Sequence, residues 1–202
     1  MFPMFLNLSG KLAVVVGCGT VGRRKLEALR ESGARLRVVD PNAESEAEHV
    51  AEPYRADHIA GAALVFACAT PDVNARVVAD ARAAGIWVNS SSAPAEGDFA
   101  VPAVVRRGDF ALAVGTGGAA PALARRVREK LESEYDETFG EWVRVLIEVR
   151  AEVLAREPDP ARRRELLDGF AAWEWLARVR AEGATAVKAA MLAALHSPGS
   201  AS

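Results

Sequence analysis

The feature that most constrains this chain is a glycine array at Gly17, Gly19 and Gly22, which directly follows the apolar run Leu12–Val16 and precedes an amphipathic segment ending at Gly33. Strand, tight turn and helix start in this order predict a dinucleotide-binding turn, because glycine permits the turn, the close approach of a diphosphate and the packing of helix on strand. The unpaired N–H groups of the helix start would hold the diphosphate. The residues expected there are Gly17, Gly19, Thr20, Val21 and Gly22.

A second β run, Leu36–Val39, ends at Asp40. An acid about 20 residues beyond the glycines is where a carboxylate accepts hydrogen bonds from the adenosine ribose hydroxyls. Asp40 would also repel a 2′-phosphate, so we expect NAD as the cofactor in preference to NADP. We expect Pro41 to lie beside the dinucleotide as well. A packed βαβ unit without a ligand remains the alternative at this point.

The rest of the first half continues the alternation of strand and helix. The apolar run Ala62–Thr70 predicts a central parallel strand, helical spacing follows it from Asp72 to Gly85, and Ile86–Asn89 predicts a further strand. With right-handed crossovers, this series predicts an α/β fold of the Rossmann-like, doubly wound type. The arm Met1–Gly10, with Phe2, Met4, Phe5 and Leu8, is expected to lie extended on the sheet.

Two weaker segments separate these elements. We expect Pro41–Glu48, which is acidic and poor in large apolar residues, to form a loop or one helical turn, and a short strand to run from His49 to Glu52. Ser90–Gly97 is a small-residue loop that leaves a strand, where α/β sheets place ligands.

After this loop the pattern changes. Phe99–Val105 and Phe110–Val114 predict a hairpin joined by residues 106–109, and a helix is expected from Pro121 to Leu131. From Thr138 the chain reads as helical, with a break at Pro158–Pro160, continuations at Leu166–Val179 and Val187–Leu195, and a frayed tail at 197–202. Trp142, Val145, Leu146, Val149 and Val153 form one stripe, interpreted as core or interface. We therefore divide the chain into residues 1–98, 99–136 and 137–202.

Composition excludes several classes of protein. A formal net charge of -2 argues against a dedicated nucleic-acid binder, and no apolar run approaches the ~18 residues of a membrane span. Cys18 and Cys68 lack the CxxC spacing and are expected to be buried thiols in a reducing compartment. His49, His58 and His196 are isolated, so no metal site is expected. We expect a cytoplasmic protein without a signal peptide.

Five separated motifs then occur in order: Pro3–Gly10 (PMFLNLSG), Val15–Lys25 (VVGCGTVGRRK), Ala69–Asn74 (ATPDVN), Asn89 with Pro94 before Phe99–Ala103 (FAVPA), and Thr116–Arg125 (TGGAAPALAR). In these motifs the chain resembles the precorrin-2 dehydrogenase family, the dehydrogenase module of sirohaem synthases. The resemblance extends to about Leu167. It implies a homodimer whose interface is built by the segment after the Rossmann domain, with helices of the C-terminal domain beside the active site.

The resemblance also implies a reaction. Members of this family oxidise the tetrapyrrole precorrin-2 to sirohydrochlorin with NAD, on the route to sirohaem or cobalamin, and some insert ferrous iron. Thr70, Asn74 and Asn89 can line the nicotinamide site. Guanidinium groups beside a glycine turn suit the carboxylates of such a substrate, although each could instead belong to a solvated basic face. The substrate-binding candidates are Arg106, Arg107, Thr116, Gly117, Gly118, Arg125 and Arg126.

The departures from the family pattern bear on catalysis. Ser92 stands where the family has an aspartate credited with acid/base work, and a hydroxyl cannot act as a carboxylate base. Hydride transfer can still proceed through orientation, with the proton lost to water or to Asp98, whereas chelation should suffer more. Further departures are Gly22, Gly115, Ala120 and the abridged segment 41–54. The catalytic candidates are Ser92, Asp98 and Thr116.

We therefore expect an NAD-dependent precorrin-2 dehydrogenase without iron insertion. Three alternatives stay open: a bifunctional dehydrogenase and ferrochelatase, a non-catalytic tetrapyrrole- or NAD-binding carrier or sensor, and a Rossmann scaffold that acts on another substrate.

Overall fold

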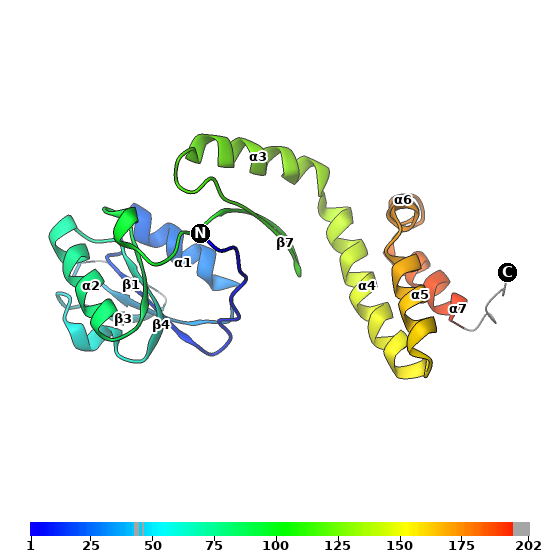
Figure 1. Ribbon diagram of the computed structural model, residues 1–202, viewed down its shortest axis with the longest axis horizontal. Coiled ribbons are helices and arrows are strands. Elements are labelled where there is room, and N and C mark those ends of the chain that lie inside the picture. The colour runs from blue at the N-terminus through cyan, green and yellow to red at the C-terminus, as the bar shows by residue number, and fades with distance from the viewer. Residues whose placement is uncertain (43–44, 46, 196–202) are drawn as a thin grey trace. The chain divides into compact units, whose positions relative to one another are not determined.

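The computed structural model describes residues 1–42, 45 and 47–195 (Figure 1). The chain divides into two compact units, Met1–Val101 and Pro102–Ser202. The predicted frayed tail, His196 and part of the predicted 41–48 loop lie outside the described residues.

The first unit is built on a five-stranded parallel sheet with the order β3-β2-β1-β4-β5. The strands are β1 (Leu12–Val16), β2 (Arg35–Val39), β3 (Glu48–Val50), β4 (Ala62–Ala67) and β5 (Trp87–Ser90). The helices are α1 (Thr20–Arg30), α2 (Pro71–Ala83) and the short 3-10 turns η1 (Ala56–Ile59) and η2 (Pro94–Glu96). The predicted Rossmann-like fold class is confirmed.

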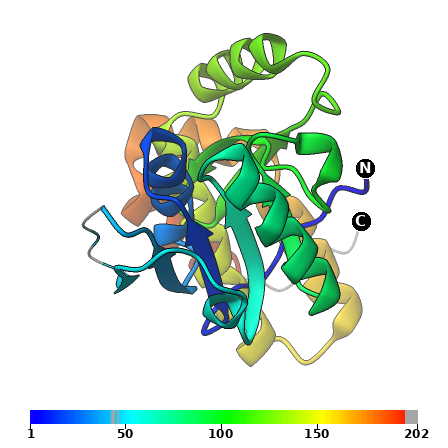
Figure 2. The same ribbon diagram turned by 90° about the vertical axis from the view of Figure 1, so that its left-hand side faces the viewer.

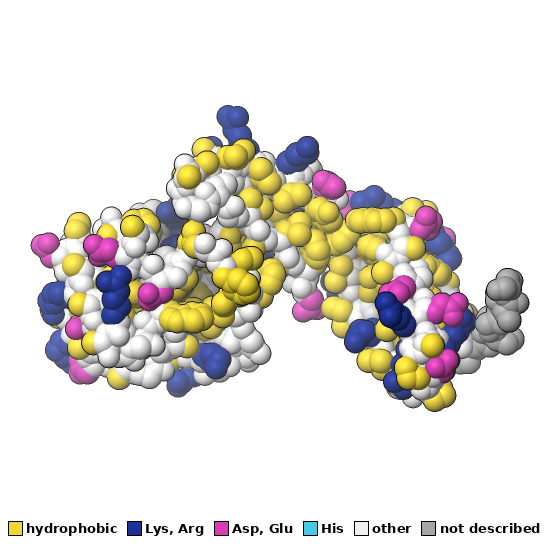
Figure 3. Space-filling view, viewed as in Figure 1, with side chains coloured by type: hydrophobic (Ala, Val, Ile, Leu, Met, Phe, Trp, Pro, Cys, Tyr) yellow, Lys and Arg dark blue, Asp and Glu magenta, His cyan; other side chains and the backbone are white. Residues whose placement is uncertain are grey.

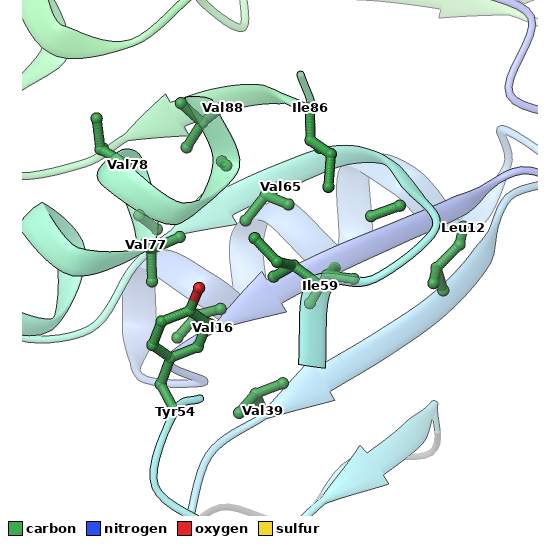
Figure 4. Packing of buried hydrophobic residues seen from close by; sticks show 14 residues of the cluster. Leu12, Val16, Val39, Tyr54, Ile59, Val65, Val77, Val78, Ile86 and Val88 are labelled. Atoms are coloured by element: carbon green, nitrogen blue, oxygen red, sulfur yellow. The ribbon is translucent and has the colours of Figure 1, made fainter. Parts of the chain in front are cut away.

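The two faces of this sheet are covered by different elements (Figure 2). Leu26 and Leu29 of α1 pack on one face with Leu8. On the other face, Val77 and Val78 of α2 join a cluster with side chains from η1 and the strands, drawn in Figure 4. All five residues of β1 are buried, because this strand lies between two others and is covered on both faces.

Several boundaries differ from the sequence prediction. β4 ends at Ala67 rather than Thr70, because the chain must turn before Thr70, which is the N-cap of α2, and Pro71, which begins that helix. The predicted placement of the N-terminal arm on the sheet is wrong except at Leu8: Phe2 is 82% exposed and Phe5 75% exposed. Only the turn after Leu8 is tied to the domain, through the Gly10 N–H and the Gly33 carbonyl.

The second unit begins with an antiparallel hairpin of β6 (Ala103–Arg107) and β7 (Phe110–Val114). The predicted hairpin is confirmed, but its first strand starts at Ala103 instead of Phe99, and the turn is only Gly108-Asp109. Gly108 has a φ of +59°, which suits the first position of a two-residue hairpin turn. Helix α3 (Pro121–Glu134) follows, starting where Pro121 predicts it.

Four helices complete this unit: α4 (Glu137–Arg156), α5 (Pro160–Phe170), α6 (Trp173–Glu182) and α7 (Ala184–Ala194). Asp136 caps α4 by accepting the Phe139 N–H at 2.9 Å. The predicted stripe is the buried face of α4, although Leu146 packs at its edge and is only partly buried. The predicted continuous helix Leu166–Val179 is divided between α5 and α6 at residues 171–172.

Among the described helices, none combines the length and the apolar character needed to cross a membrane.

Candidate functional site

The turn after β1 is held in one conformation by its glycines. Gly17 has a φ of +90°, and a Cβ there would lie 2.6 Å from the backbone N of Ala69. A Cβ on Gly22 would overlap the carbonyl oxygen of Gly17, so α1 packs closely on the strand that precedes it. At Gly19, by contrast, a Cβ would meet nothing within 4 Å. The open side of the turn is therefore at Gly19.

The start of α1 offers unpaired donors at this open side. Gly19 is the N-cap and supplies no side chain to the first turn, and Thr20 begins the helix. The first N–H groups of a helix have no partner within the helix, and they carry the positive end of its dipole. This arrangement fits the diphosphate of a dinucleotide, as the glycine spacing predicts.

Asp40 connects the glycine turn to the end of β2. Its Oδ2 accepts the Cys18 N–H at 2.7 Å, and its Oδ1 accepts the Asn42 N–H at 2.8 Å. A carboxylate only accepts hydrogen bonds, so a ribose hydroxyl would bind here as a donor. Pro41 is exposed directly after it. The carboxylate therefore lies beside the glycine turn, on the side of β1 away from β4.

On the other side of β1, Asn74 of α2 joins the ends of β4 and β5. Its side chain is fully buried. Oδ1 accepts the Ala69 N–H at 2.8 Å, and Nδ2 donates to the Ala69 carbonyl at 3.2 Å, the Ser91 hydroxyl at 3.4 Å and the Ser92 hydroxyl at 3.0 Å. Ser92 is exposed, as is Thr70 at the start of α2. Asn74 thus reaches the site through Ser92 rather than by its own exposed surface.

Asn89 and Asp98 anchor the segment that follows the serine loop. Asn89 is buried and donates its Nδ2 hydrogen to the Phe99 carbonyl at 2.8 Å. The Asp98 carboxylate accepts the Val88 N–H at 2.9 Å, while the Asp98 N–H binds the Val88 carbonyl. β5 is an edge strand, and Asp98 satisfies backbone groups along that edge.

Two side chains near the strand ends were not among the sequence-predicted site residues. Ser91 donates its hydroxyl hydrogen to the Ala67 carbonyl at 2.9 Å and also contacts Cys68. Lys25 of α1 points toward β4, with Nζ 5.9 Å from the Phe66 ring, and burial lowers the pKa of its amine. Its place directly after the glycine motif was the signal that could have found it.

The two cysteines are buried and free, as predicted. Burial raises the pKa of the Cys18 thiol, and it raises the pKa of the Cys68 thiol as well. Both thiols therefore stay protonated and poorly nucleophilic near neutral pH. Among the described residues, no group of three or more histidine, cysteine or acidic side chains is arranged to hold a metal ion.

The second unit carries the glycine turn after β7. The Ala119 N–H binds the Thr116 carbonyl, and the Thr116 Oγ1 accepts the Ala120 N–H at 3.3 Å. Gly117 and Gly118 both have positive φ, at +63° and +84°. Arg106, Arg125 and Arg126 are exposed on the hairpin and α3. Arg125 lies 3.8 Å from Glu129, one turn along its own helix.

Arg107, a predicted substrate-binding residue, is instead engaged within the second unit. It donates to the Glu132 carbonyl at 3.1 Å and the Arg106 carbonyl at 2.8 Å, and its Nε lies 3.2 Å from a Glu137 carboxylate oxygen without hydrogen-bond geometry. Its side chain is only 16% exposed. The guanidinium therefore joins the hairpin to the end of α3 and the start of α4.

We expect Arg107→Met to lower the free energy of unfolding of the second unit by about 1–3 kcal/mol, because the Glu132 carbonyl loses its donor. Urea unfolding followed by the fluorescence of Trp142, Trp173 and Trp175 measures this. Arg125→Met is the matched control, with less than about 0.5 kcal/mol expected for an exposed pair. Unchanged stability in Arg107→Met, together with a raised KM for a carboxylate-rich substrate, would instead show that Arg107 binds substrate.

Comparison with known proteins gives two family matches that follow one another along the chain. Residues 4–103 match a family described as NAD(P)-binding, and residues 107–134 match the sirohaem biosynthesis protein central domain. The first match spans the glycine turn, Asp40, Asn74 and Ser92. The second contains the hairpin turn, the Thr116 loop and the whole of α3.

Curated relatives point the same way. The chain is 40% identical over 171 residues to a siroheme synthase of Ectopseudomonas mendocina, covering 80% of this chain and 37% of that protein. It is 39% identical over 190 residues to a siroheme synthase of Pseudomonas aeruginosa, covering 89% of this chain and 41% of that protein. The chain thus spans about two fifths of the length of these relatives.

A solved structure named SirC, precorrin-2 dehydrogenase, has the same fold. It aligns with a TM-score of 0.76 and 23% identity, covering 96% of this chain and 100% of that chain. At this identity the likeness concerns the fold. The two consecutive family matches and the sirohaem synthase relatives together show that the chain belongs to the family of the NAD(P)-binding modules of sirohaem synthases.

Proposed function

We propose that the chain oxidises precorrin-2 to sirohydrochlorin with NAD as the hydride acceptor. The observation that carries this proposal is the pairing of a dinucleotide site with a polar loop at the same edge of one sheet. The glycine turn and Asp40 lie at the carboxyl ends of β1 and β2, and Asn74, Ser91 and Ser92 lie at the ends of β4 and β5. The SirC relative in fold is named a precorrin-2 dehydrogenase.

The reaction removes two hydrogens from the substrate. NAD takes one of them with its electron pair as hydride, and the other leaves as a proton. The strand order β2-β1-β4-β5 would carry the dinucleotide from its adenosine end at Asp40, over the N-terminus of α1, to its nicotinamide end near Ser92. The chain's contribution is to orient the substrate C–H bond against the ring, because orientation alone supplies much of such a rate.

The proton is proposed to leave to water. Within residues 1–42, 45 and 47–195, the hydrogen-bond partner of the Ser92 hydroxyl is the Asn74 amide, which donates to it and is not a base. The Asp98 carboxylate accepts the backbone N–H of Val88, near the middle of β5, so Asp98 stabilises the edge strand.

We therefore expect Asp98→Asn to change kcat for precorrin-2 oxidation by less than about threefold, because the amide oxygen still accepts the Val88 N–H and no proton transfer is lost. Stopped-flow measurement of NADH formation checks this. Asp98→Ala is the structural comparison and should lower stability by about 1 kcal/mol by leaving that N–H without its acceptor. A drop in kcat of about 100-fold in Asp98→Asn with unchanged folding would identify Asp98 as the proton acceptor.

The substrate bears many carboxylates, and we propose that Arg106, Arg125 and Arg126 contribute to binding them together with the Thr116–Gly118 turn. Exposed guanidinium groups pair with carboxylates in a bidentate fashion, and turn N–H groups add donors. Arg107 is left out of this set because its donors are engaged within the second unit.

We also propose a homodimer. Leu123 and Val127 of α3 are 55% and 37% exposed and lie one turn apart, and Ile147 and Leu154 of α4 are 46% and 43% exposed and lie seven residues apart. Figure 3 shows apolar side chains gathered over these helices. In the part of the chain that the structure describes, β6 and β7 pair with no third strand, and an isolated two-stranded hairpin also favours a partner. Light scattering of the purified chain, with a mass of 21.5 kDa per copy, tests this.

The experiment that tests the activity is anaerobic incubation of the protein with precorrin-2 and either NAD or NADP, with and without ferrous iron. The sirohydrochlorin spectrum is followed. Sirohydrochlorin that accumulates with NAD and is not consumed with iron supports the dehydrogenase. Iron-dependent consumption supports a bifunctional dehydrogenase and ferrochelatase, which Ser92 disfavours because pyrrole protons then lack a carboxylate acceptor. Binding of precorrin-2 without turnover supports a non-catalytic carrier or sensor.

A further inference from the structure

Asn74 is an unusual residue for the buried face of a helix. Its side chain has no exposure, and it lies among apolar neighbours of α2 such as Val77 and Val78. A buried amide is costly unless its donors and acceptor are all used. The amide of Asn74 forms hydrogen bonds with two separate loops, the Ala69 turn after β4 and the serine loop after β5.

The hydrogen-bond count at Asn74 fixes the role of its amide. Oδ1 takes the Ala69 N–H, so the two Nδ2 hydrogens serve three acceptors. The bond to the Ser92 hydroxyl, at 3.0 Å, is the shortest of the three. The bonds to the Ala69 carbonyl and the Ser91 hydroxyl, at 3.2 and 3.4 Å, share the other hydrogen.

The two serines are therefore left in different states. The Ser91 hydroxyl donates back to the Ala67 carbonyl at 2.9 Å, so its hydrogen is engaged inside the fold. The Ser92 hydroxyl accepts from Asn74, and among the described residues it has no acceptor for its own hydrogen. Because Ser92 is exposed and its oxygen is occupied from the protein side, its hydrogen is directed outward as a donor.

We infer that Asn74 is a positioning residue that sets Ser92 as a hydrogen-bond donor to the nicotinamide end of the bound dinucleotide. The inference rests on the dinucleotide binding proposed above. A nicotinamide carboxamide offers a carbonyl oxygen as the acceptor, and a hydroxyl held from behind can orient it without extra side-chain freedom. In this role Ser92 orients the nicotinamide ring for hydride transfer and takes no part in acid/base chemistry.

The test compares two ligands that share everything except the nicotinamide. NADH and ADP-ribose both contain the adenosine and the diphosphate, so Asp40 and the α1 N-terminus should bind them alike. We expect Ser92→Ala to weaken NADH binding about 3- to 10-fold, the equivalent of one neutral hydrogen bond, and to leave ADP-ribose binding unchanged. Ser92→Thr keeps the hydroxyl and should restore NADH affinity.

Asn74→Asp tests the positioning role. The isosteric carboxylate cannot donate, so the Ser92 hydroxyl turns inward to donate to it, and NADH binding should weaken as in Ser92→Ala. The double variant should bind NADH no worse than either single variant, because both changes remove the same donor. Asn7→Asp, on the exposed N-terminal arm, is the matched control for the added charge. Additive losses in the double variant, or equal losses for NADH and ADP-ribose, would overturn the inference.

A measurement on the unaltered chain covers the case in which Asn74→Asp does not fold. The two Asn74 amide protons should exchange slowly in ¹⁵N spectra, and their shifts should move on NADH binding but not on ADP-ribose binding. If the wild-type chain binds ADP-ribose but the chemical shifts of the Asn74 amide do not change on NADH addition, the positioning role is wrong while dinucleotide binding is still supported. If it binds neither ligand, the proposed function itself fails and the inference with it.

Discussion

Replacing Gly17 by alanine is expected to lower the free energy of unfolding of the first unit by about 3–5 kcal/mol, from the strain of a positive φ and from overlap with backbone. The φ of +90° disfavours any side chain, and the new Cβ would lie 2.6 Å from both the Ala69 nitrogen and the Cys68 carbonyl carbon. Backbone atoms cannot move aside as a flexible side chain can. Hydrogen exchange of peptides from β1 and β4 in increasing urea measures the loss in this unit alone.

Gly19→Ala is the matched variant. Its φ of -68° suits alanine and nothing lies within 4 Å of the new Cβ, so stability should change by less than about 1 kcal/mol. The methyl group would instead stand where the diphosphate approaches, and NAD affinity should fall about 10- to 100-fold. Should Gly17→Ala fold normally, or Gly19→Ala bind NAD as well as the parent, the geometric account of this turn would be wrong.

The second large effect is expected at Asp40. Two like charges 4 Å apart repel by about 4 kcal/mol at an effective dielectric constant of 20, and partial exposure reduces this for Asp40 and a 2′-phosphate. We therefore expect the parent chain to prefer NAD to NADP, and Asp40→Asn to shift the ratio of the two Kd values toward NADP by about 10- to 100-fold. Titration calorimetry with both dinucleotides measures the ratio.

Asp40→Asn also weakens a hydrogen bond within the glycine turn, and the ratio of the Kd values for NAD and NADP is insensitive to this loss. Both carboxylate oxygens accept backbone N–H groups, from Cys18 and Asn42, and the amide nitrogen must face one of them. Both dinucleotides suffer this change equally. Asp57→Asn is the control for the lost charge, since Asp57 lies in η1, at the opposite end of β4 from the glycine turn. Equal affinity of the parent for NAD and NADP would contradict the assignment of Asp40.

The first half of the fold was predictable because its signals are local. The apolar run of β1, the glycines and the alternation of strand and helix each follow from neighbouring residues, and right-handed crossovers then leave few topologies. The N-terminal arm shows where such reasoning ends. Its apolar spacing resembles a strand, yet only Leu8 is buried, because burial depends on a surface being available and on backbone partners that a short arm does not have.

The candidate site shows the same division. The positions of the glycines and Asp40 after two successive strands were enough to predict that they are neighbours, since the strands of a parallel sheet end at one edge. Sequence reasoning assigned Asn74 and Asn89 to the nicotinamide as lining residues, whereas both are buried and act on connecting loops. Arg107 resembles Arg106 in the sequence, and what distinguishes it is the hydrogen bond to the Glu132 carbonyl, 25 positions away.

What the sequence by itself determined is the order of strands and helices, the dinucleotide turn and the family, because these depend on residue type at fixed spacing. Only the tertiary structure decided which polar side chains face the site and which support it. That choice is set by hydrogen bonds between segments far apart in the chain. Asn74 and Ser92 are 18 positions apart and Arg107 and Glu132 are 25 apart, and neither pairing follows from any local pattern.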